Sequence, residues 1–477
     1  MPAPDVSASH LLAVLQHELL LFAGFFFLLG ALDDMVVDLY WFWLRRKGEA
    51  STIRVNGGEL AEAPLEGAAA IFLPASPAHR LVGETIAQIL GAWRQAELRL
   101  YVGCHRSDRA TIEAAMVGGN GDPRLRLVIH DHAGPCTRAA CLDRLYEALC
   151  RDEERAGFGA RMVVIQAPGD RVDPAALGLL DQAIGGADLV QLPLLPLAQP
   201  RRCWISAYLF GELAELHGKA MVVRGALEAG LPTTGGGLAI AREVLARLAE
   251  ADPAQGPFTR DSLALDYEFG LRLAAAGGRC RLLRARHADG TLVATRSQFP
   301  ATVGEAVRHR ALAIQGNALE AWDRLGWPNI GRPASLAEGW MRLRDRRAPL
   351  SAMVLLASYL SLAILVAGWI VPHWGAFVLA PLPGNLALLL EACALVLLWR
   401  VGARFAFAAR EAGPAGGSRA VLAIPLGHLL QIVATARALR DYARSLAVRP
   451  WAQASHRQAT VREPADAQPQ TGFRSMR

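Results

Sequence analysis

The 477-residue sequence has few cysteines, and two long stretches of it carry little or no charge. The seven cysteines form no CxxC pair and no Cys/His spacing typical of a zinc site, which argues against a zinc module and predicts free thiols in a reducing compartment. No Lys or Arg precedes the apolar stretch at 11–32, and residues 350–371 carry no charge at all. A secretory signal peptide would begin with basic residues, so the first stretch is expected to remain as an anchor.

Both apolar stretches are long enough to cross a membrane. A helix rises about 1.5 Å per residue, so about 20 residues span a hydrocarbon core of ~30 Å. A third stretch, 374–399, has the same character. Residues 420–435 form a shorter segment that contains Pro425 and His428, and we expect it to lie as an amphipathic helix at the membrane surface, with a fourth span as the alternative. Membrane lipid is therefore an expected partner.

Arginines predict the orientation. Arg45 and Lys47 follow the first span and Arg342 and Arg347 precede the second, so the positive-inside rule places the central part in the cytoplasm of a bacterial inner membrane. This topology accounts for the net charge of +6, and nucleic-acid binding is not expected. The predicted parts are a transmembrane helix with an interfacial segment, a cytoplasmic domain, membrane and interface helices, and a disordered tail. They occupy residues 1–47, 48–347, 348–451 and 452–477.

The central part alternates apolar runs with helical patterns. The runs predict strands at 68–74, 98–103, 125–130, 162–166 and 188–194. Residues 79–94 and 137–150 have the three- and four-residue apolar spacing of helices. Continuous apolar strands between helices are typical of an α/β domain with a mostly parallel sheet covered on both faces. Ligands of such sheets bind beyond the carboxyl ends of the strands, here the loops that start at Pro74, Gly103, His130 and Gln166.

Several motifs in this order resemble membrane-bound family 2 glycosyltransferases, and most of all the glycosyltransferase portion of the phage-adsorption protein B family. They lie at residues 133–149, 215–245, 262–280 and 425–442. The resemblance implies a GT-A-like fold and transfer of a sugar, with inversion, from a nucleotide-sugar to an envelope polysaccharide or lipid-linked acceptor. Such a reaction needs a general base and a positive charge or metal on the leaving diphosphate.

The resemblance assigns the catalytic base to Asp266. The family's Thr-Glu-Asp stands here as Ala264, Leu265 and Asp266, so the proposed base is present without its acidic neighbour. An Asp in this place also suits the start of the following helix, which it would stabilise by about 0.5–2 kcal/mol as a cap. Both interpretations stay open.

The metal motif departs further from the family. The resemblance implies Mg²⁺ or Mn²⁺ held by an Asp-x-Asp pair after the strand at 162–166, but Ala167 and Gly169 stand at those positions. Asp170 is the nearby carboxylate that would substitute as a ligand of the metal and the nucleotide-sugar. The alternative is an ordinary loop carboxylate.

Other residues are candidates for the nucleotide-sugar. Arg138 lies where the family has a Lys, at the start of a helix whose N-terminus favours a diphosphate, although Thr137 also suits a plain helix cap. Gly235, Gly236 and Gly237 allow close approach of a sugar, or form a tight turn. His309 and Arg310 fall in the segment of the family's Gln-x-x-Arg-Trp motif, where guanidinium groups suit phosphate and solvated charge is the alternative.

Two functions follow from these departures. The first is an active membrane glycosyltransferase. The second is a catalytically inactive homologue that acts as a scaffold in an envelope-polysaccharide export or phage-receptor complex. A transporter is less favoured, since the three spans contain almost no polar residues.

Overall fold

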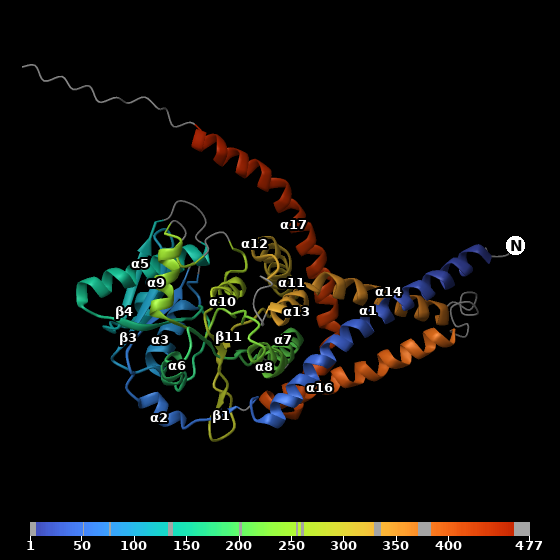
Figure 1. Cartoon of the computed structure of the whole chain (residues 1–477), viewed down its shortest axis with the longest axis horizontal. Coiled ribbons are helices and arrows are strands. Elements are labelled where there is room, and N and C mark those ends of the chain that lie inside the picture. Colours follow the sequence, from blue (N-terminus) through green and yellow to red (C-terminus); the bar gives the residue numbers. More distant parts are fainter. Residues whose placement is uncertain are drawn as a thin grey trace, which may run out of the picture.

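The computed structural model describes residues 6–50, 52–75, 78–131, 137–199, 203–253, 256–258, 262–328, 335–370 and 383–461. An α/β domain carries long helices that extend to one side (Figure 1). The strands are β1 (Ile53–Arg54), β2 (Ala68–Pro74), β3 (Leu98–His105), β4 (Leu125–His130), β5 (Ala160–Ile165), β6 (Leu189–Gln191), β7 (Leu194–Pro196), β8 (Leu238–Ala241), β9 (Cys280–Leu282), β10 (Ala285–Arg286) and β11 (Thr295–Ser297). The helices of the first half are α1 (Val6–Lys47), α2 (Gly57–Glu62), α3 (Val82–Ala92), α4 (Arg109–Gly119), α5 (Arg138–Ala156), α6 (Ala176–Ile184), α7 (Trp204–Glu215), the π-helix η1 (Leu216–Ala220) and α8 (Met221–Ala226). Those of the second half are α9 (Arg242–Ala251), α10 (Leu265–Ala275), α11 (Val303–Ala313), the π-helix η2 (Ile314–Glu320), α12 (Ala321–Leu325), α13 (Ser335–Arg346), α14 (Ala348–Ile370), α16 (Gly384–Leu422) and α17 (Ile424–Val461).

A seven-stranded sheet in the order β4-β3-β2-β5-β8-β6-β9 forms the centre of the domain. Every neighbouring pair is parallel except those made by β8, which is antiparallel to both β5 and β6. The predicted α/β class with a mostly parallel sheet is confirmed. Two short parallel pairs, β1 with β10 and β7 with β11, lie beside this sheet.

Both faces of the sheet are covered, which explains the continuous apolar strands. On β2, Ile71 and Leu73 point into a core formed with α3 and α6. Phe72 lies between them and points to the opposite face, where it packs with Leu142 and Leu145 of α5. Successive residues of a strand face opposite sides, so a strand in a three-layer domain needs an apolar side chain at each position.

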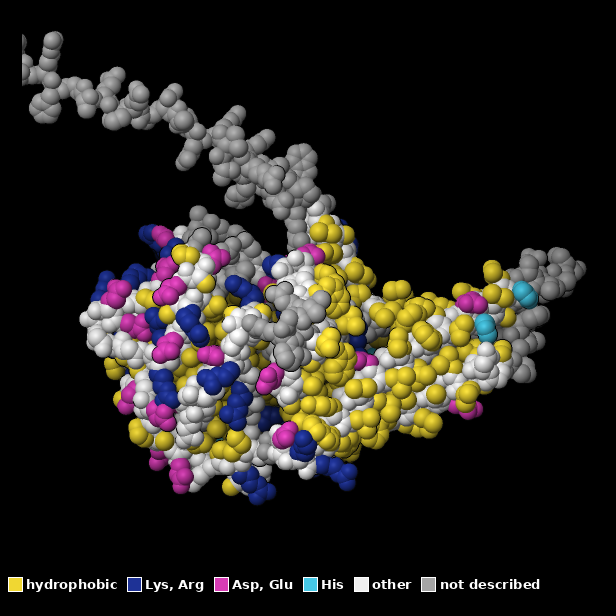
Figure 2. All heavy atoms as spheres, in the orientation of Figure 1, with side chains coloured by type: hydrophobic (Ala, Val, Ile, Leu, Met, Phe, Trp, Pro, Cys, Tyr) yellow, Lys and Arg dark blue, Asp and Glu magenta, His cyan; other side chains and the backbone are white. Residues whose placement is uncertain are grey.

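Three helices, α1, α14 and α16, are long and apolar enough to cross a membrane. Figure 2 shows the apolar side chains that cover them where they extend from the domain. The third helix begins at Gly384, and residues 371–382, which include the first part of the predicted third span, lie outside the described residues. It bends at Gly413, whose φ is 73°, directly before Pro414. The predicted interface segment, 420–435, begins in the last turn of α16 and continues into α17 after a break at Ala423, and the predicted tail is helical as far as Val461.

Carboxylates on α1 fasten the long helices to the domain. Asp34 pairs with Arg344 at 2.8 Å, with Arg347 at 2.6 Å and with Arg400 on α16. One turn further along, Asp38 pairs with Lys219 of η1 at 2.5 Å. Charges that leave water need such partners, so this network couples the position of α1 to that of the domain.

Candidate functional site

The glycine turn, defined here as Gly235–Gly237, lies at the sheet edge where β5 and β6 end. It leads into β8, and because β8 is antiparallel, its amino end lies beside the carboxyl ends of these two parallel strands. Ligands of α/β sheets bind at this edge. The antiparallel strand therefore carries the glycine turn into the place that the sequence predicts for the site.

Two buried glutamine side chains make hydrogen bonds with the backbone of the glycine turn. Gln166 follows β5 and is 1% exposed, and its Oε1 accepts a hydrogen bond from Gly237 N at 3.1 Å. Gln191 ends β6 and is fully buried; its Nε2 donates to Gly236 O at 2.8 Å, and its Oε1 accepts from Thr234 N at 3.1 Å. Buried amide bonds of this kind fix the backbone of the turn. Sequence reasoning missed both roles, for which the available signal was a Gln at the end of each apolar strand.

The turn packs closely against two carboxylates. A Cβ atom on Gly235 would lie 2.6 Å from Asp266 Oδ2, and one on Gly236 would lie 2.5 Å from Asp170 Oδ2. The φ angles of Gly235 and Gly237 are 82° and 66°, a conformation that side chains with a Cβ rarely adopt. The three glycines thus allow the backbone to touch both acidic groups.

Arg138 joins this cluster through an ion pair. Its Nε lies 3.5 Å from Asp266 Oδ1, and its Nη2 donates to Gly235 O at 2.5 Å. Both charged side chains remain about one-third exposed. Arg138 is the first residue of α5, which Thr137 caps as expected by accepting a backbone N–H at 3.2 Å. Asp266 is not a cap, because Ala264 occupies that position and Asp266 lies in the first turn of α10.

Asp170 is the buried member of the cluster, at 1% exposure. Its Oδ2 accepts from Ala167 N at 2.7 Å and its Oδ1 from the Ser297 hydroxyl at 2.5 Å. Burial and, to a smaller extent, the charge of Asp266 raise the pKa of Asp170, while its two hydrogen bonds and the positive charge of Arg138 lower it, and the net pKa is about 6. Asp170 is therefore a carboxyl that gains a proton just below neutral pH.

The arrangement does not fit a divalent cation. Mg²⁺ is usually held by one or two carboxylates and keeps several waters around it. Both oxygens of Asp170 already accept hydrogen bonds, and Asp266 is paired with the guanidinium of Arg138. Ala167 and Gly169 supply only backbone groups, and the described residues contain no cluster of three or more metal-ligating side chains. No chemical step is therefore assigned to a metal.

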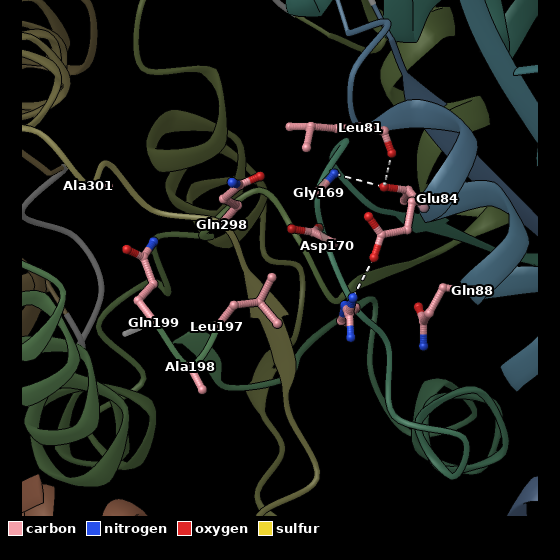
Figure 3. Close-up of a pocket in the computed structure, with 12 residues that line it drawn as sticks. Leu81, Glu84, Gln88, Gly169, Asp170, Leu197, Ala198, Gln199, Gln298 and Ala301 are labelled. Carbon is pink, nitrogen blue, oxygen red and sulfur yellow. Dashed lines mark hydrogen bonds and ion pairs between the residues drawn. The ribbon is translucent and has the colours of Figure 1, made fainter. Parts of the chain in front are cut away.

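A cavity of about 380 Å³ opens beside Asp170 (Figure 3). Glu84 and Arg171 form an ion pair on one wall, and Gln199 and Gln298 lie on the other. This volume falls within the range of about 300–1,000 Å³ for small-molecule sites. The polar walls suit a ligand rich in hydroxyl and phosphate groups.

His309 and Arg310 lie away from this cluster. Arg310 Nη1 lies 2.5 Å from Glu212 Oε2 on α7, and its Nε donates to Gln431 Oε1 on α17 at 2.6 Å. The ring of His309 packs edge-on against that of Phe299, with centroids 6.1 Å apart, and burial lowers its pKa. Arg310 thus joins three helices, and the structure brings together only the other predicted residues.

Comparisons with known proteins agree with the sequence motifs. The model of the family described as glycosyl transferase family group 2 matches residues 169–371, which include the glycine turn and Asp266. The chain is 26% identical over 360 residues to bacteriophage adsorption protein B of Escherichia coli strain K12 and to bacteriophage N4 adsorption protein B of Escherichia coli O157:H7. These alignments cover 71% of this chain and 47% of each relative. The chain therefore spans about half the length of the curated relatives it matches.

Two of the solved structures to which the chain is similar are both distant in sequence. The mannosyltransferase PcManGT from Pyrobaculum calidifontis, in complex with GDP-Man and Mn²⁺, is 16% identical with a TM-score of 0.47, over 88% of this chain and 99% of that chain. Glucosyl-3-phosphoglycerate synthase from Mycobacterium tuberculosis, in complex with Mg²⁺ and uridine-diphosphate, is 17% identical with a TM-score of 0.34, over 59% of this chain and 89% of that chain.

Proposed function

We propose that this chain, which is similar to family 2 glycosyltransferases, transfers a sugar from a nucleotide-sugar to an envelope polysaccharide or lipid-linked acceptor at the cytoplasmic face of a bacterial inner membrane. One observation carries the proposal: Arg138, Asp170, Asp266 and the glycine turn meet at one edge of the sheet. A partly exposed carboxylate and a guanidinium in contact are the two groups that sugar transfer from a diphosphate requires.

Asp266 is the general base and Arg138 the partner of the leaving group in this proposal. The guanidinium moves from Asp266 to the diphosphate, aided by the N–H groups that open α5. The freed carboxylate accepts the proton of the acceptor hydroxyl. The acceptor oxygen then bonds to the anomeric carbon while the bond from that carbon to the phosphate oxygen breaks, and the electron pair leaves with the diphosphate.

The protonation of Asp170 adjusts the charge of this site. With Asp170 and Asp266 ionised and Arg138 positive, the cluster carries a net charge of −1, which disfavours a diphosphate. Protonation of Asp170, with its pKa of about 6, brings the net charge to zero. Nucleotide-sugar binding is therefore expected to strengthen as the pH falls through 6.

The charge of the long helices supports the proposed location. Arg45 follows the apolar part of α1, Arg344 and Arg347 precede α14, and Arg404 and Arg410 lie in the second half of α16. These positions all lie toward the α/β domain, which the positive-inside rule places in the cytoplasm. An acceptor anchored in the bilayer would then reach the site from the membrane side.

The test uses the full-length chain with a panel of UDP- and GDP-sugars and membrane lipid. Asp266→Asn is expected to lower turnover at least about 10²-fold while nucleotide binding, read by thermal shift, persists. Arg138→Ala is expected to weaken binding itself. Arg144→Ala is the matched control, because Arg144 lies on the same helix α5, half-exposed and paired with Glu147. Absence of both binding and turnover across the panel would refute the proposal.

An inactive scaffold is the second candidate, favoured by the side chains at the metal positions. Ala167 and Gly169 provide no carboxylate there, and Gly169 N is used to bond Thr85 Oγ1 at 2.8 Å. A scaffold in an envelope-polysaccharide export or phage-receptor complex would keep its cellular role in the Asp266→Asn variant. Loss of that role at normal protein level would exclude the scaffold and favour the enzyme.

A further inference from the structure

A second cavity, of about 150 Å³, lies where α1 and α16 meet Arg284, the residue before the strand β10. Trp41, Arg45, Arg284 and Arg410 line it, together with Gly48, Ala50 and Thr52 of the segment that follows α1. The strand β1 brings these elements together, because Ile53 N donates to Arg284 O at 3.1 Å directly after that segment. Residues of α1, of α16 and of the α/β domain thus line the same cavity.

Arg284 is the buried arginine that lines this cavity, and its charge is only partly neutralised. It is 8% exposed, and its Nε is buried without a hydrogen-bond partner. Its ion pair with Glu411 is long, at 4.0 Å, and the same Glu411 oxygen also pairs with Arg286. Burial, together with the charges of Arg410 and Arg286, lowers the pKa of Arg284 to about 10. A buried N–H donor of a charged group therefore lacks an acceptor.

The surrounding charge is strongly positive. Arg45, Arg284 and Arg410 line the cavity, and Glu411, the carboxylate that pairs with Arg284, is shared with Arg286. These five residues carry a net charge of +3. Buried charge is costly unless it is matched by an opposite charge. An anion in the cavity would supply both the missing charge and the acceptor for Arg284.

The cavity opens beside an apolar surface. Arg45 and Arg410 on its rim are exposed, and the exposed apolar side chains Phe42, Trp43 and Phe405 lie on the same two helices. Figure 2 shows Lys and Arg side chains at the lower edge of the apolar surface, where Figure 1 shows the end of α1. Aromatic side chains followed by arginines are typical of the level of lipid head groups.

We propose that this cavity binds a phosphate group and that the head group of an anionic membrane lipid supplies it. Guanidinium forks match phosphate oxygens, and a phosphate has five heavy atoms. The cavity of about 150 Å³ has room for a group of this size, since it equals the liquid volume of roughly five waters at ~30 Å³ each. The proposal rests on the arginines of this cavity and does not depend on the transferase activity.

The test measures thermal unfolding of the full-length protein under two conditions. In neutral detergent, inorganic phosphate is titrated against chloride at constant ionic strength; in nanodiscs, phosphatidylglycerol is added to phosphatidylcholine. Both are expected to stabilise the wild type and the control Arg46→Ala, which alters the exposed neighbour that does not line the cavity. Arg45→Ala and Arg284→Gln are expected to weaken the phosphate response about tenfold or more. Arg284→Gln should also unfold no earlier than the wild type without phosphate, because it removes a buried charge that its long ion pair with Glu411 only partly neutralises, and Arg286 still pairs with Glu411.

The outcomes test the phosphate site and tell whether lipid or free phosphate fills it. Stabilisation by both ligands, lost in the two cavity variants, supports the phosphate site, and stabilisation by phosphatidylglycerol alone assigns it to lipid. Stabilisation by inorganic phosphate alone overturns the lipid source. Equal responses of Arg45→Ala and Arg46→Ala overturn the site, and this pair decides the matter even where Arg284→Gln does not fold, since both side chains are exposed.

Discussion

Replacement of Asp170 by Asn tests the buried carboxyl at the centre of the site. The amide has the same shape, and its oxygen still accepts the hydrogen bond from Ala167 N. The hydroxyl of Ser297, which now donates to Asp170, rotates to accept from the new NH₂ group. The variant therefore removes the charge of Asp170 and little else.

The size of the effect follows from the pKa of Asp170. An ordinary Asp has a pKa of 3.8, and burial raises that of Asp170 to about 6, which corresponds to roughly 3 kcal/mol. The folded pKa lies above the unfolded one, so the wild type is most stable, relative to Asp170→Asn, below pH 3.8. That advantage declines between about pH 4 and pH 6 and is lost above the folded pKa.

Thermal unfolding of both proteins from about pH 4.5 to pH 7.5, followed by Trp fluorescence, measures this trend. Asp122→Asn is the control, because its hydrogen bond with Arg124 holds the pKa of Asp122 below its usual value. That carboxylate stays ionised above about pH 5 in both states, so its effect on stability should not vary. A difference between the wild type and Asp170→Asn that stays constant with pH would refute the reasoning.

Three further substitutions, one of them a control, probe the glycine turn and the helix network. Gly235→Ala and its control Gly290→Ala both place a Cβ atom at a positive φ, 82° and 87°, and each should cost about 1–2 kcal/mol of stability. Only the Cβ atom on residue 235 would meet neighbouring atoms. Gly235→Ala alone should therefore also abolish nucleotide binding in a thermal-shift assay. Equal binding by the two variants would contradict this. Asp34→Asn removes one carboxylate from Arg344, Arg347 and Arg400, while Asp33 still pairs with the first two, and it should lower the stability in detergent by about 1–3 kcal/mol. An unchanged unfolding temperature would show that this carboxylate contributes nothing.

The sheet was largely predictable from sequence because its strands are buried on both faces. The strands β2 and β4 occupy residues 68–74 and 125–130, as the apolar runs indicate. The helix α5 was predicted to end near residue 150 but continues to Ala156, since its last turns carry charged residues that give no apolar period. The antiparallel insertion of β8 was not predicted, because a single short apolar run does not reveal its direction.

The site was predictable only in part, for a related reason. Arg138, Asp266 and the glycine turn carry recognisable chemistry and do converge. The roles of Gln166 and Gln191 depend on hydrogen bonds to the glycine turn, which exist only because β8 lies between the two strands that these glutamines end. The residues around Gln166 and Gln191 in the sequence do not indicate that β8 lies beside them.

The predicted phosphate contact of Arg310 illustrates the same limit. Its carboxylate partner, Glu212, lies 98 residues earlier in the chain. Basic residues on a helix suit a phosphate or a distant acid equally well, and only the packing of α11 against α7 and α17 decides between them. The composition of one helix does not contain that information.

The carboxylates of α1 determine when during synthesis its ion pairs can form. Asp33 and Asp34 leave the ribosome 311 and 313 residues before their respective partners Arg344 and Arg347. At a synthesis rate of about 5–20 residues per second, these two carboxylates have no arginine partner from this pair for on the order of tens of seconds. The ion pairs of α1 with these two arginines therefore form only after the chain of the α/β domain has been synthesised.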